Sequence, residues 1–98
     1  MRILIAEDDQ VLADGLLRTL RSAGAAVDHV ASGSEADAAL LLQNFDLLIL
    51  DLGLPQMSGL EVLRRLRGRG SHTPVTRPPR STVQAEHRAR ISWSLWLM

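Results

Sequence analysis

The sequence predicts an α/β fold in which helices flank a parallel β-sheet. Short apolar runs at residues 2–6, 26–30 and 46–50 alternate with segments whose apolar residues recur every three or four positions. The third run is continuous and bounded by acids, which is typical of a central parallel strand buried on both faces. Three strand–helix units in succession favour right-handed crossovers between parallel strands.

The first unit begins with a predicted strand, Arg2–Ala6, that ends in three consecutive acids. Asp9, the last of them, is expected to cap the following helix, because an N-cap aspartate accepts a hydrogen bond from an unpaired backbone N–H. Leucines at every fourth position form one face of this helix, and Gly24 is expected to end it. Ala26–Val30 is the second predicted strand.

Serines mark the starts of the next two helices. Ser32 and Ser58 are each followed three residues later by a glutamate, which is the spacing of a capping box. Asp46–Leu50 supplies the third strand between these helices. Residues 52–58 contain a glycine and a proline, so they are predicted to form a loop.

The pattern changes near Pro74. Thr73–Val75 could open a fourth strand, but the prolines that follow cannot donate ladder hydrogen bonds. The sheet is therefore expected to be incomplete after the third strand–helix unit. Residues 1–74 would form a partial domain, and residues 75–98 a basic tail that is predicted to be helical over about 82–96.

A sheet that stops at the third strand leaves that strand at an edge. An apolar edge such as Leu47–Leu50 invites pairing with another chain, so homodimerisation or aggregation is expected.

Charge is distributed unevenly although it sums to zero. Residues 1–61 carry ten acids and three arginines, a net charge of −7, whereas residues 62–98 carry eight arginines and one acid, a net charge of +7. This asymmetry indicates an acidic domain with a basic tail, or two joined stretches of different origin. A reading-frame change or truncation near residue 74 is one hypothesis. A nucleic-acid-binding arm is the rival, since arginines bind phosphate and tryptophans stack on bases.

Several classes of protein are disfavoured by composition. The absence of cysteine removes disulfides and thiolate metal sites and fits a reducing compartment. The N-terminal apolar run is too short for a signal peptide, and no run approaches the roughly 18 apolar residues of a membrane span. A soluble, cytoplasmic protein is expected.

Acidic residues follow both the first and the third predicted strands. Ligands of open parallel sheets bind beyond the carboxyl ends of strands, where the strand order reverses. If the order is 2-1-3, Asp8 and Asp51 converge on one cleft, where a hard divalent cation with oxygen ligands, most simply Mg²⁺, suits the repelling carboxylates. Asp51 could then act as a nucleophile in phosphoryl transfer, with the metal stabilising charge. The competing interpretation is that such acids cap helices or are hydrated, and it is retained for Asp9.

The run ILIAEDD at residues 3–9, followed by DLLILDLGLPQMSG at residues 46–59, resembles the receiver domain of a two-component response regulator. It is most similar to the OmpR-like subfamily, whose members carry a winged-helix DNA-binding domain after the receiver. The resemblance extends to about residue 74. It implies a flavodoxin-like fold with strand order 2-1-3-4-5. It also implies a signalling module rather than an enzyme, one that at most assists its own phosphorylation and dephosphorylation.

The resemblance further implies that Asp51 accepts a phosphoryl group from the phosphohistidine of a sensor histidine kinase. It implies Mg²⁺ bound by Asp8, Asp51 and the backbone carbonyl of Gly53, with Glu7 assisting through water. Thr76 lies too close to the start of a fourth strand to supply the family's switch hydroxyl.

The family's lysine is absent, because the chain contains no lysine. An arginine could substitute for it as a cation; the candidates are Arg77, Arg80, Arg88 and Arg90.

Two alternatives remain open. The chain could be an inactive fragment of such a regulator. It could also be a phosphatase of the haloacid-dehalogenase type, but that chemistry usually has a second aspartate two residues after the first, where this chain has Gly53. A dinucleotide-binding fold is disfavoured, because no Gly-x-Gly-x-x-Gly follows the first strand.

Overall fold

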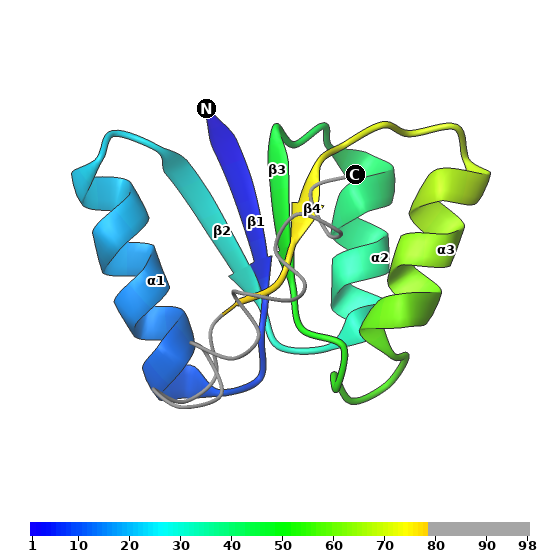
Figure 1. Cartoon of the computed structure of the whole chain (residues 1–98), viewed down its shortest axis with the longest axis horizontal. Coiled ribbons are helices and arrows are strands. Elements are labelled where there is room, and N and C mark those ends of the chain that lie inside the picture. The colour runs from blue at the N-terminus through cyan, green and yellow to red at the C-terminus, as the bar shows by residue number, and fades with distance from the viewer. Residues whose placement is uncertain (79–98) are drawn as a thin grey trace.

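A computed structural model describes residues 1–78, which form a parallel four-stranded sheet flanked by helices (Figure 1). The strand order is β2-β1-β3-β4. The elements are β1 (Arg2–Ala6), α1 (Gln10–Ser22), β2 (Ala26–Val30), α2 (Gly33–Leu42), β3 (Leu47–Leu50), α3 (Gly59–Gly68) and β4 (Val75–Thr76). The predicted helix over about 82–96 lies outside the described residues. In the part of the chain that the structure describes, no helix combines the length and apolarity needed to cross a membrane.

The sheet separates two apolar cores, because side chains alternate between its faces. One face packs against α2 and α3, and Leu4, Leu48 and Leu50 are buried there with Val62 of α3. The other face packs against leucines of α1; its buried members are Ile3, Ile5, Val27 and Ile49. Figure 1 shows α1 on one side of the sheet, with α2 and α3 together on the other. This parallel α/β arrangement confirms the predicted fold class.

The helix starts also form as predicted, although the glutamates behave differently from the capping-box expectation. Asp9 accepts a hydrogen bond from the Leu12 N–H at 3.2 Å, and Ser32 and Ser58 cap α2 and α3 in the same way. Glu61, three residues after Ser58, instead accepts hydrogen bonds from arginines on the next turn of α3. In both helices the serine hydroxyl accepts a hydrogen bond from one of the backbone N–H groups that the first turn leaves unpaired, and the Ser32 hydroxyl also donates to Glu35.

The prediction that β3 forms the edge of the sheet is wrong, because β4 pairs with β3 and takes the edge position. Val75 and Thr76 pair in parallel with Leu48 and Ile49, and both are at most 5% exposed. The pairing is possible because Pro78 lies beyond it, so no ladder N–H is lost. The expected dimerisation or aggregation through an open β3 edge therefore loses its structural basis over these residues.

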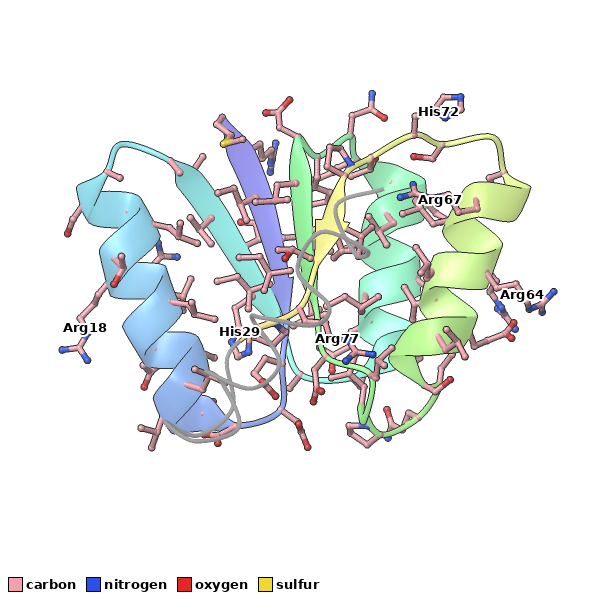
Figure 2. The ribbon with its side chains drawn as sticks, viewed as in Figure 1. Arg18, His29, Arg64, Arg67, His72 and Arg77 are labelled. Carbon is pink, nitrogen blue, oxygen red and sulfur yellow. The ribbon has the colours of Figure 1, made fainter. Side chains whose placement is uncertain are left out.

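The loop between α3 and β4 is shaped by Arg67. Its Nη1 donates hydrogen bonds to the backbone oxygens of Ser71 at 3.1 Å and Thr73 at 2.8 Å. Figure 2 shows Arg67 on the side of α3 that faces this loop. A charged donor shared by two carbonyls fixes the return of the chain toward β3. The two-residue strand thus depends on a side chain in the preceding helix.

Candidate functional site

The carboxyl ends of β1 and β3 lie side by side, as the predicted strand order requires. Ala6 pairs with Leu50, and the Asp51 N–H donates to the Ala6 backbone oxygen at 3.0 Å. The residues that follow these two strands, Glu7 and Asp51, therefore start from adjacent positions. This is the end of the sheet at which α/β folds place their ligands.

Three carboxylates converge there. One oxygen from each of Glu7, Asp8 and Asp51 lies within 4.8 Å of the other two. Glu7 is fully buried and Asp51 is 2% exposed, whereas Asp8 faces solvent. At this separation two ionised carboxylates repel by about 3 kcal/mol if the effective dielectric constant is about 20. Asp8 and Asp51 are thus brought together as predicted, in a cluster that a cation would stabilise.

Backbone N–H groups orient both buried carboxylates. The Asp9 N–H donates to Glu7 Oε2 and the Gly53 N–H donates to Asp51 Oδ1, each at 3.2 Å. In both cases the donor lies two residues after the acid, in the turn that leaves the strand. Asp9 directs its own side chain into the cap of α1 and stays outside the cluster, in agreement with its predicted role.

Helix α3 begins directly against the backbone of Asp51, the residue that follows β3. The Gly59 N–H donates to the Leu52 backbone oxygen at 3.0 Å, and a Cβ on Gly59 would overlap the backbone oxygen of Asp51. Only glycine allows this approach without a shift of the backbone. The loop from Leu52 to Ser58 therefore has both of its ends fixed at the site.

His29 contacts the site and was missed by sequence reasoning. Its Nε2 lies 2.7 Å from the Glu7 backbone oxygen, which can only accept, so the imidazole donates. Figure 2 places His29 at the carboxyl end of β2. The signal was available, because β2 pairs with β1 and His29 lies opposite Ile5.

Thr76 lies in β4, and Arg77 directly follows it. This threonine pairs with Ile49, two residues before Asp51, so its backbone lies short of the acidic cluster. Figure 2 shows Arg77 at the same end of the sheet as His29. The other arginines considered as cations, Arg80, Arg88 and Arg90, lie outside the described residues.

Comparison with known proteins identifies relatives over most of the chain. It is 53% identical over 75 residues to the response regulator protein PmrA of Pseudomonas aeruginosa. It is 47% identical over 75 residues to the transcriptional regulatory protein TctD of Salmonella typhimurium. Each match covers 76% of this chain and 34% of the relative, so the chain spans about a third of the length of these curated relatives.

Solved structures of receiver domains and response regulators also match the chain. The receiver domain of the sensor histidine kinase PA1611 from Pseudomonas aeruginosa, solved with a magnesium ion coordinated in its active site cleft, superposes with a TM-score of 0.74 at 31% identity. That match covers 78% of this chain and 64% of the other. A complex of the histidine kinase ThkA with the response regulator protein TrrA matches with a TM-score of 0.71 at 32% identity, over 78% of this chain and 66% of that one.

The family model for the response regulator receiver domain matches residues 3–83. This match, the identity to PmrA and TctD and the parallel sheet with its acidic end all agree with the family predicted from the sequence. The chain therefore belongs to the response regulator receiver family, whose members are signalling modules.

Proposed function

We propose that Asp51 accepts a phosphoryl group in a Mg²⁺-dependent reaction, and that the phosphohistidine of a sensor histidine kinase is the donor. One observation carries the proposal: the buried Asp51 carboxylate stands in a cluster with Glu7 and Asp8 at the ends of two adjacent strands. A carboxylate held in this way is a nucleophile placed beside the ligands of a cation.

The donor set fits Mg²⁺. All three side chains offer carboxylate oxygens, which suit a hard divalent cation, and the chain has no cysteine to favour a softer one. Asp8, Asp51 and the backbone carbonyl of Gly53 would hold the ion, with Glu7 assisting through water. When bound, the ion would neutralise the negative charge that the carboxylates and the phosphoryl oxygens bring together.

In the transfer, an oxygen of the Asp51 carboxylate forms a bond to phosphorus while the phosphorus–nitrogen bond of the donor breaks. The electron pair of that bond stays on the imidazole nitrogen, which takes up a proton. The Gly53 N–H, bound to Asp51 Oδ1, fixes the orientation of the attacking group. Burial of Asp51 to 2% exposure limits the access of water to the acyl phosphate that forms.

The similarity to known regulators supports the proposed partner and biological context. One solved structure that matches this chain is the complex of the histidine kinase ThkA with the response regulator protein TrrA. PmrA and TctD are named as regulators, and TctD as a transcriptional one, but each is about three times as long as this chain's match to it. We infer that this chain supplies the receiver function of a cytoplasmic transcriptional response regulator.

The test is the transfer of phosphate from acetyl phosphate in the presence of Mg²⁺, followed by intact mass measurement of the 98-residue chain. We expect a single phosphate adduct that is lost in Asp51→Asn and on chelation of Mg²⁺. An equal adduct on Asp51→Asn would exclude Asp51 as the acceptor. No adduct on the wild type would favour the alternative of an inactive fragment.

A further inference from the structure

The loop that joins β3 to α3 is held in a strained conformation. Gln56 has a φ of 54° and Met57 a φ of 112°, and neither is glycine. Positive φ values cost a side-chain-bearing residue free energy, so they persist only when the surroundings enforce them. The contacts of this loop with the rest of the fold must therefore be specific.

Those contacts are made with the start of α2. The Gly33 N–H donates to the Pro55 backbone oxygen at 3.0 Å, and the Ser34 hydroxyl donates to Gln56 Oε1 at 3.3 Å. A Cβ on Gly33 would overlap the Met57 carbonyl oxygen and would lie 2.6 Å from the Met57 carbonyl carbon. These are backbone atoms that cannot rotate away, so the loop closes on α2 only because residue 33 is glycine.

The same loop orients the side chain of Asp51. Gly53, two residues into the loop, donates its N–H to Asp51 Oδ1, and the far end of the loop is fixed by the hydrogen bond from Gly59 to Leu52. If the loop backbone moved at Met57, Gly53 would have to move as well, because the segment between these two residues is short and both ends of the loop are constrained. The orientation of the Asp51 carboxylate therefore depends on residue 33 having no side chain.

We propose that Gly33 is a positioning residue for the cation site: by letting the β3–α3 loop seat against α2, it sets the orientation of the Gly53 N–H and hence of the Asp51 carboxylate. The proposal rests on the proposed function, because it assumes that Asp51 binds the cation. Gly33 itself is not a member of the acidic cluster.

The test compares Gly33→Ala with two controls in the 98-residue chain. Gly15→Ala adds a methyl group where nothing lies within 4 Å, and Val27→Ala lowers stability by truncating the core beneath α1. Mg²⁺ affinity is measured by isothermal titration calorimetry. The amide shift of Gly53 is measured by NMR without Mg²⁺, which reports the hydrogen bond to Asp51 directly.

We expect Gly33→Ala to weaken Mg²⁺ binding by about tenfold or more, which is the range for groups that orient metal ligands. It should also move the Gly53 amide signal, whereas both controls keep the wild-type affinity and shift. A folded Gly33→Ala protein with the wild-type affinity and Gly53 shift would overturn the proposal. So would a loss of affinity in Val27→Ala equal to that in Gly33→Ala, because the effect would then follow stability.

Two further outcomes are decided by the same measurements. If Gly33→Ala does not fold, Ser34→Ala is tested instead; it removes the hydroxyl that donates to Gln56 and that lies 3.2 Å from the Ser32 hydroxyl. This variant must shift the Gly53 amide and weaken Mg²⁺ binding measurably; no change would refute the positioning role. If the wild type binds no Mg²⁺, the proposed function fails, and the Gly53 shift in the metal-free variants still decides whether residue 33 orients the loop.

Discussion

Replacing Thr76 with valine should stabilise the fold. Thr76 is 5% exposed, and its hydroxyl oxygen is buried without a hydrogen-bond partner in the described part of the chain. A buried polar group that lacks a partner costs roughly 1–3 kcal/mol, and valine fills nearly the same volume without that cost. We therefore expect Thr76→Val to raise the free energy of unfolding by about 1–2 kcal/mol.

The assay is urea unfolding followed by circular dichroism, with thermal unfolding as a second probe. For a domain of this size, each kcal/mol corresponds to a shift in Tm of roughly 4–8 °C, so the expected gain is measurable. The m-value should be unchanged, because the substitution does not alter the surface exposed on unfolding.

Thr73→Val is the matched control. The Thr73 hydroxyl lies 2.9 Å from the Ser71 hydroxyl, and both sit in the loop before β4. Removing a hydroxyl that is hydrogen-bonded should cost about 1 kcal/mol, the opposite sign to the change at Thr76. A loss of stability in Thr76→Val similar to that in Thr73→Val would show that the Thr76 hydroxyl is satisfied and would refute the reasoning.

Two further outcomes concern α3. Arg67→Ala should lower the free energy of unfolding by roughly 1–3 kcal/mol in urea, because it removes two charge-assisted hydrogen bonds to the loop before β4. Arg64→Ala removes only an exposed ion pair with Glu61, so it should change the free energy of unfolding little. Equal losses of stability in Arg67→Ala and Arg64→Ala would contradict this reasoning. Hydrogen bonds from Arg64 and, to a smaller extent, from Arg65 lower the pKa of Glu61 from 4.5 to about 2. Their contribution to stability is therefore present above pH 4.5 and lost as the pH falls toward 2. A carbon NMR titration of the Glu61 carboxyl should show this low pKa, and a higher one in Arg64→Ala; an ordinary pKa in the wild type would exclude the pairing.

The first three strands could be predicted because their signals are local. Apolar runs bounded by acids or turn residues mark Arg2–Ala6 and Ala26–Val30, and the structure has the same bounds for both. β4 could not be predicted in this way, since two residues show no periodicity. Its formation depends on tertiary contacts: Arg67 donates two hydrogen bonds to the loop before it, and Leu48 and Ile49 are its pairing partners.

The candidate site was predictable to the extent that it follows from strand order. The convergence of Asp8 and Asp51 required only that the first and third strands be neighbours. The resemblance to receiver domains implied that order, and a topological rule placed the ligand site at the carboxyl ends of those strands. His29 could have been added from the pairing of the second strand with the first. Gly33 could not, because nothing in the local sequence indicates that a loop more than twenty residues later packs against its α-carbon. The assignment of Asp51 as phosphoryl acceptor stays a prediction.

Calorimetric titration of Mg²⁺ into the wild type, Asp8→Asn and Asp51→Asn tests most directly whether these two carboxylates share one ion. The account predicts one binding site in the wild type that is lost, or weakened by about tenfold or more, in both variants. Asp14→Asn, on the exposed side of α1 where Asp14 is hydrogen-bonded by Gln10, should bind as the wild type does. Unchanged Mg²⁺ affinity in either Asp8→Asn or Asp51→Asn would contradict a shared site.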